Sequence, residues 1–167
     1  MNADHFRRLF AYNTWANARV WEHILSLSEE QVQQPSSYSI GSIHNQIVHL
    51  IEVEGLLYRR ALQQPPQPLR KPDTFADRAA IRARWEEISA QWNAALADLT
   101  DPQLAAAVDY TSVNTGKAFR NPMWEILYQC LNHGTDHRAQ LLALIHAVGG
   151  ETSGQDFISF SWEQPAS

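Results

Sequence analysis

Four long stretches of the sequence repeat apolar residues at the spacing of an amphipathic helix, and this repetition limits the chain to few folds. Pro65 and its neighbouring prolines interrupt the pattern, and Gly149 ends it. Helices with one apolar face must bury that face against one another, so the sequence predicts an all-α antiparallel four-helix bundle. The predicted helices cover about residues 4–27, 42–63, 75–99 and 121–148.

A small hairpin is predicted between the third and fourth helices. Residues 108–113 and 117–119 are rich in strand-forming side chains, and they flank Asn114-Thr115-Gly116, which is typical of a turn. Just before them, Thr100-Asp101-Pro102 has the form of a helix cap and first turn. We therefore expect a short helix near residues 101–106, followed by the hairpin.

Capping residues predict where the last two long helices begin. Asp73 or Thr74 is suited to cap the third helix. Asn121 followed by Pro122 predicts the start of the fourth, with Asn121 as the cap. The tail, residues 151–167, carries Phe157, Ile158, Phe160 and Trp162, and we expect it to pack back on the helices because these side chains are costly to expose.

Length, charge and cysteine content narrow the class of protein. The 167 residues suffice for one domain with one core, so we expect a single domain over 1–167. A net charge of −5 gives no basic surface for nucleic acid or an anionic membrane. Cys130 is the single cysteine, which excludes an intrachain disulfide. No stretch resembles a signal peptide or a membrane span, so we expect a cytoplasmic protein.

A pair of histidines in the fourth predicted helix has the spacing of a metal site. His133 and His137 are four residues apart and lie on one helix face, where two imidazoles can bind one ion. A third ligand must come from elsewhere, and His49 beside the apolar stripe of the second helix is the best candidate. The alternative is that these histidines are buried residues satisfied by hydrogen bonds.

Four other polar residues allow two interpretations each. Asn13 and Asn17 lie in the middle of the apolar face of the first helix, so they either bond across the core or line a polar cavity. Glu52, close to His49, is a candidate general base or support for a metal ligand, or else a solvated carboxylate. Cys130 lies one turn before His133; a small buried apolar role is favoured over metal ligation.

The remaining polar and aromatic residues are interpreted as surface groups. Trp15 points away from the apolar face of its helix and indicates a second packing surface, such as one for another subunit. Asp136 points away from the two helical histidines and is expected to be exposed. The other histidines and the charged run of the third helix are predicted to face solvent: His5, His23, His44, His146, Arg78, Arg82, Arg84, Glu86 and Glu87.

Three motifs resemble the DinB/YfiT-like superfamily of metal-dependent proteins. They are residues 12–17 (YNTWAN), residues 49–52 (HLIE) and residues 132–140 (NHGTDHRAQ), of which the last is the most specific. The resemblance implies a four-helix bundle in up-down-down-up order, frequent homodimers, and a divalent metal completed by water. Its ligands, carried over to this sequence, are His49, His133 and His137. The family name does not imply DNA binding.

The resemblance also implies a class of reaction. Known activities in the superfamily depend on low-molecular-weight thiols and include bacillithiol transfer and mycothiol-dependent isomerisation. It therefore implies a metal-dependent enzyme acting on a small molecule, either a thiol S-transferase or a hydrolase. The alternative is a non-catalytic metal-binding or stress-response dimeric bundle. Three nitrogen ligands favour zinc or nickel and are also compatible with iron or copper.

Overall fold

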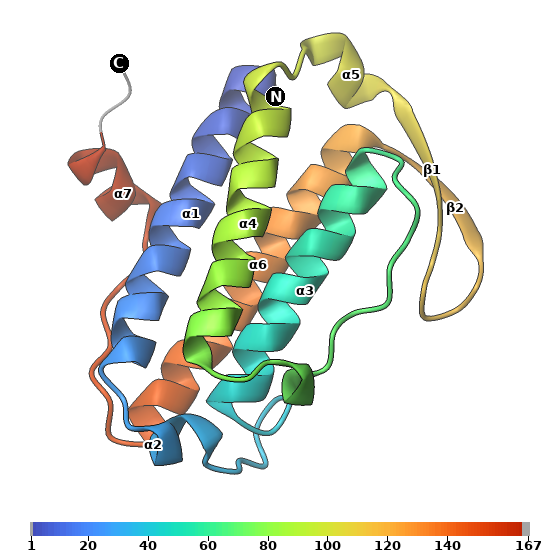
Figure 1. Cartoon of the computed structure of the whole chain (residues 1–167). Helices are drawn as coiled ribbons and strands as arrows, with labels where there is room; N and C mark the ends of the chain where they lie inside the picture. The colour runs from blue at the N-terminus through green and yellow to red at the C-terminus, as the bar shows by residue number, and fades with distance from the viewer. Residues whose placement is uncertain (1, 165–167) are drawn as a thin grey trace.

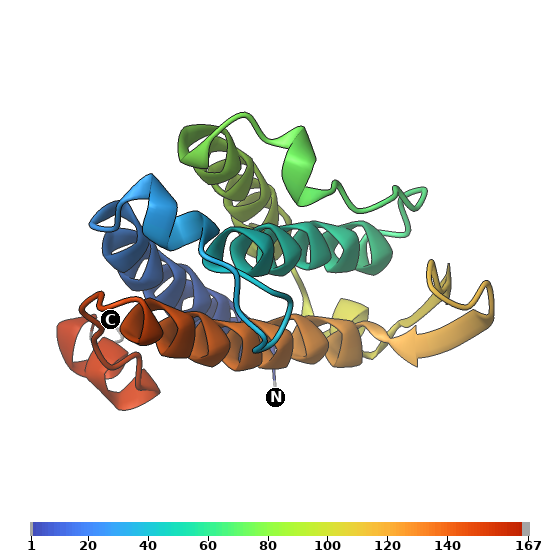
Figure 2. The same cartoon turned by 90° about the horizontal axis from the view of Figure 1, so that it is seen from below.

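The computed structural model describes residues 2–164, and it is mostly helical with one small two-stranded sheet. Four long helices lie side by side; α1 and α6 run in one direction, and α3 and α4 in the other (Figures 1 and 2). Among them, α3 makes its most extensive contact with α6. The long helices are α1 (Ala3–Leu25), α3 (Ile43–Ala61), α4 (Arg78–Ala97) and α6 (Met123–Ala147).

Short elements connect and flank these helices. The predicted hairpin is present: β1 and β2 pair antiparallel, with Val108 opposite Asn121. The short helix predicted before the hairpin is also present, as α5. The short elements are α2 (Glu29–Gln33), the 3-10 turn η1 (Pro72–Thr74), α5 (Asp101–Ala105), β1 (Ala107–Thr111), β2 (Ala118–Pro122) and α7 (Phe157–Glu163).

Two predicted helix starts are wrong by a few residues. The third long helix begins at Arg78, because Asp77 caps it with a 2.8 Å hydrogen bond from the Ala80 amide while the earlier candidates form η1. The fourth begins at Met123, because Asn121 and Pro122 belong to β2 and pair with β1. A local cap signal was thus overruled by strand pairing.

The apolar stripes of the four long helices meet in one core. Phe10 of α1 packs on Trp92 of α4 with ring centroids 4.8 Å apart, and Ile88 of α4 and Leu141 of α6 are fully buried. At its far end, α6 stops at Gly149, whose φ of +82° is a conformation that favours glycine. In the described part of the chain, no helix combines the length and apolarity needed to cross a membrane.

The second packing surface of α1 is covered by the chain's own C-terminal segment. The Trp15 indole donates a 2.8 Å hydrogen bond to Glu163, and its ring lies 5.8 Å from that of Phe160. The tail therefore packs back as predicted, although its aromatic residues are not all buried, since Trp162 is 74% exposed. Residues 165–167 of that predicted tail lie outside the described residues.

Part of the charged run of α4 is buried, contrary to prediction. Arg84 donates from Nε to Oε1 of Glu52 over 3.1 Å, and the two side chains are only 12% and 5% exposed. Arg78 donates to the carbonyl oxygens of Ile24 and Leu27. These two arginines join α4 to its neighbours, whereas Arg82 and the two glutamates of the run face solvent as expected.

We predict that Arg84→Met lowers the free energy of unfolding by about 3 kcal/mol, because it leaves the Glu52 carboxylate buried without its partner. Adding Glu52→Leu should recover most of that loss. The matched control is Arg82→Met, which removes an exposed ion pair and should change stability by less than about 1 kcal/mol. Urea unfolding measures all four proteins; equal effects of the two single arginine variants would contradict this role.

Candidate metal centre

The structure brings the three predicted histidines together. His49 lies on α3, His133 and His137 lie one turn apart on α6, and their candidate ligand atoms are all within 4.8 Å of one another. Nε2 of His49 lies 3.3 Å from Nε2 of His133. Two motifs that are 84 residues apart in the sequence thus form one cluster that could hold a metal ion.

The electrostatics of the cluster suit metal binding. Burial lowers the pKa of all three histidines, and the neighbouring rings of His137 and His49 help to lower that of His133 to about 3. The imidazoles are therefore neutral near pH 7, which is the form that donates a lone pair to a metal. Each side chain is also partly exposed, so solvent reaches the cluster.

A buried glutamine, which sequence reasoning missed, fixes the orientation of His137. The amide of Gln46 lies 2.6 Å from Nδ1 of His137, and it bonds also to Gln140 over 2.9 Å and to the Ser39 hydroxyl over 2.8 Å. Gln46 is fully buried on α3, one turn before His49. Such a partner on Nδ1 directs Nε2 of His137 toward the cluster. The signal in the sequence was a polar residue among the apolar positions of α3.

Comparisons with known proteins identify the family of the chain and a solved structure with the same fold. The family model described as "DinB family" matches residues 1–166. The chain belongs to the DinB family. Among solved structures it is similar to a DinB-like protein from Bacillus cereus ATCC 10987, at 16% identity over 92% of this chain and 97% of that one, with a TM-score of 0.67. That similarity shows a shared fold. No curated protein matches the sequence.

In this DinB family member, Asn13 and Asn17 bond across the core, the first of their two interpretations. Both amide oxygens accept from Nη1 of Arg138 on α6, which is fully buried. Nε of Arg138 donates to Gln155 over 2.7 Å, and Nη2 donates to Thr135 over 3.3 Å. Sequence reasoning gave Arg138 no role, because an arginine beside a histidine pair most often faces solvent.

Gly134 makes room for this network. A Cβ atom at that position would lie 2.7 Å from Oδ1 of Asn13 and 2.8 Å from Nη1 of Arg138, closer than such atoms approach. The DinB motif at residues 132–140 therefore contacts two helices, α3 and α1. Its histidines face α3, while Gly134 and Arg138 face α1.

The other candidate residues lie outside the histidine cluster. Glu52 accepts from Arg84 and from the backbone amide of Arg70 and is buried, so the interpretation as a solvated carboxylate is wrong. Cys130 is buried, and burial raises the pKa of its thiol well above the usual range, which fits an apolar packing role.

Of the histidines predicted to lie on the surface, one is buried, one is partly buried, and the others are exposed. His44 is wrongly predicted, since it is buried and its two ring nitrogens contact the Gln33 amide and the Pro72 carbonyl, each at 3.1 Å. It is covered because the segment with η1 folds over that flank of α3. His23 is partly buried beside Ser153, whereas His5, His146 and Asp136 are exposed as predicted.

Glu54 is a second buried acid of α3 that the sequence reading passed over. It lies at a stripe position of the helix, and its Oε1 accepts a 3.2 Å hydrogen bond from Nδ2 of Asn13. Burial raises its pKa to about 7, while the charge of Arg138 and the bond from Asn13 oppose that rise. Glu54 therefore titrates near neutral pH in the folded protein, in contact with the network that holds α6 against α1.

We predict that Glu54→Gln removes part of the pH dependence of stability. Between its ordinary pKa of 4.5 and its folded pKa of about 7, the folded protein holds a proton that the unfolded chain releases. Raising the pH through this window therefore destabilises the wild type relative to the variant, by up to about 3 kcal/mol.

Urea unfolding from pH 4.5 to 9, with chelator present, measures that difference. Above pH 8 the difference should stay constant, because the carboxyl is then ionised in both states. The three clustered histidines contribute equally to both proteins, so the subtraction isolates Glu54. Parallel stability curves for wild type and variant would show that Glu54 does not titrate in this range.

Proposed function

We propose that His49, His133 and His137 bind one divalent metal ion and that the protein is a metal-dependent enzyme acting on a small molecule. The observation that carries the proposal is the convergence of three neutral, partly exposed imidazoles from α3 and α6. Three nitrogen ligands suit zinc or nickel first, with iron or copper also compatible. Three protein ligands also leave a position for water or substrate.

The proposed reaction is low-molecular-weight thiol transfer or hydrolysis. A metal at this site would lower the pKa of a bound thiol or water and so supply a nucleophile near neutral pH. The chain's own contribution is to keep the imidazoles unprotonated and aimed at one point. Membership of the DinB family supports this reaction class, since thiol-dependent activities are those implied by the resemblance.

We further propose one domain over residues 1–167, arranged as an up-down-down-up four-helix bundle, working as a homodimer in the cytoplasm. The directions of α1, α3, α4 and α6 support that helix order (Figure 1). The net charge of −5 supports a small-molecule partner rather than nucleic acid or an anionic membrane.

Elemental analysis of protein purified without an affinity tag or chelator tests the metal. We expect about one metal ion per chain in the wild type, because three ligands suffice to retain it. His49→Ala should lose the metal, and the matched control, His146→Ala, should keep it because that histidine is exposed elsewhere on α6.

Full occupancy in the His49→Ala variant would overturn the site, as would a wild type that takes up neither zinc nor nickel. Retained metal without thiol transfer or hydrolysis would favour the non-catalytic alternative, a metal-binding or stress-response protein.

Gln46 should control metal affinity without touching the ion. Ligation through Nε2 of His137 requires a proton on Nδ1, and the Gln46 amide must then present its oxygen to that proton. Rotating the amides of Gln46 and Gln140 together by 180° achieves this, since Gln140 then donates to Gln46 and the Ser39 hydroxyl can accept as well as donate. Gln46→Leu should therefore weaken metal binding by about 10- to 100-fold.

Competition against a chromophoric chelator measures that affinity. Gln46→Glu, which keeps an acceptor at the same place, is the matched control and should bind metal within a few-fold of the wild type. Wild-type affinity in a folded Gln46→Leu variant would refute the orienting role.

A further inference from the structure

Arg60, in the last turn of α3, has a guanidinium without a polar partner. In the described range, 2–164, its side chain contacts the Tyr110 ring and forms no hydrogen bond or ion pair. Its guanidinium carbon lies 4.1 Å from the ring centroid of Tyr110 on β1, and partial burial lowers its pKa. Stacking on a ring occupies the face of a guanidinium and leaves the N–H donors on its edge free.

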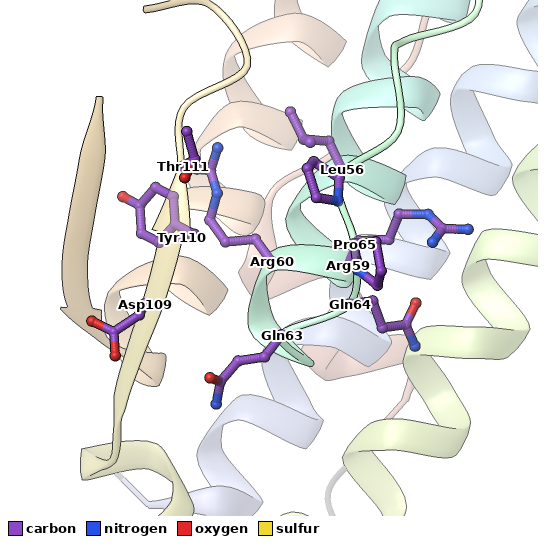
Figure 3. A pocket seen from close by; sticks show the side chains of 10 residues that line it. Leu56, Arg59, Arg60, Gln63, Gln64, Pro65, Asp109, Tyr110 and Thr111 are labelled. Atoms are coloured by element: carbon purple, nitrogen blue, oxygen red, sulfur yellow. The ribbon is translucent and has the colours of Figure 1, made fainter. Parts of the chain in front are cut away.

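This guanidinium borders a cavity of about 320 Å³ between the end of α3, the prolines that follow it, and β1. Figure 3 shows Arg60 reaching toward Tyr110, while Arg59 points to the other side. Leu56, Pro65 and the Tyr110 ring give the cavity apolar walls. A volume of this size with apolar walls and a charged group is typical of a small-molecule site.

The acid nearest in the cavity wall does not neutralise Arg60. Asp109 lines the cavity, but its carboxylate pairs with Arg120 of β2 at 3.3 Å, and both side chains are more than half exposed. In this first cavity the charge of Arg60 is therefore not paired with an acid, in a protein whose net charge is −5. A partly desolvated guanidinium of this kind binds oxyanions by paired, charge-assisted hydrogen bonds.

A second cavity, of about 390 Å³, meets the first at Arg60 and Tyr110. Its other wall is formed by Asn121 and by α6 from Glu125 to Gln129. The Glu125 carboxylate accepts a 2.6 Å hydrogen bond from the Asn121 amide and forms no ion pair with Arg60 in the described residues. Gln129 is four residues, or one helical turn, before His133. A molecule held at Arg60 thus lies along the same pair of helices that carries the histidine cluster.

We propose that the cavity at Arg60 binds the oxyanion group, a carboxylate or a phosphate, of a small molecule. The guanidinium edge donates to two oxygens of that group, and the apolar remainder packs on Leu56 and the Tyr110 ring. The proposal goes beyond the metal function and does not depend on it, because none of these residues belongs to the histidine cluster.

Metal-free protein of full length, labelled with ¹⁵N, tests the site by NMR titration. The probes share one ring and differ in charge: benzoate, phenyl phosphate and neutral benzamide. We expect at least one anion to bind with a Kd of about a millimolar and to shift the Arg60 Nε–Hε signal and the amides of Tyr110 and Thr111. Benzamide should bind at least about tenfold more weakly.

Variants separate a specific site from general attraction of anions. Arg60→Gln should weaken anion binding by about tenfold or more, and Arg60→Lys, which keeps the charge but loses the planar fork, by a smaller factor. Arg82→Gln removes the same charge from an exposed position of α4 and should bind as the wild type does. The tighter of the two anions identifies the oxyanion as carboxylate or phosphate.

Equal binding of benzamide and the anions would overturn the proposal, as would anion shifts that leave the Arg60 signal unmoved in the wild type. Equal affinities of Arg60→Gln and Arg82→Gln would also overturn it. Because the protein is metal-free throughout, failure here leaves the proposed metal function untouched, and failure of metal binding leaves this result standing.

Discussion

The buried guanidinium of Arg138 fixes how the long helices face one another. Its donors are taken up by Asn13 and Asn17 of α1 and by Gln155 beyond α6. A buried charge that loses such partners costs several kcal/mol, so α6 has one favourable rotation against α1. In that rotation the neighbouring residue, His137, is turned toward α3. The chemistry proposed for the cluster thus depends on a structural interaction on the other side of the same helix.

Residues of α3 contact both the buried network and the histidine cluster. Gln46 holds the ring of His137, while Glu54, two turns further on, accepts from the asparagine that also binds Arg138. The cluster and the buried network are therefore two layers of one interface among α1, α3 and α6. A change in the protonation of Glu54 acts on the network and not directly on the imidazoles.

The sequence predicted most of the fold and the members of the cluster. The long helices and the pair of His133 and His137 follow from spacing along a helix, whereas His49 was a candidate from another helix that the DinB resemblance also implied. Periodicity shows which side of a helix faces the core, but it does not show which helix lies there. For that reason the partners of Arg138, Glu54 and Gln46 were not foreseen. His44 was misassigned for a related reason, since a loop from a distant part of the chain covers it. The predicted starts of two helices were wrong for local reasons. Asp77, and not an earlier residue, caps α4, and the residues predicted to begin α6 pair with β1 instead.

The separation of Asn13 from Arg138 has a consequence for synthesis. The two residues are 125 positions apart, and a ribosome adding about 5–20 residues per second needs roughly 6 to 25 s to cover that distance. During this interval α3 and α4 are already made, so Asn13 can donate to Glu54 and Phe10 can pack on Trp92. The oxygens of Asn13 and Asn17, however, still lack the guanidinium that binds them. Gln155 emerges 17 residues later still. The network around Arg138 can therefore close only when α6 and the segment after it have left the ribosome, which makes it the last part of the core to form.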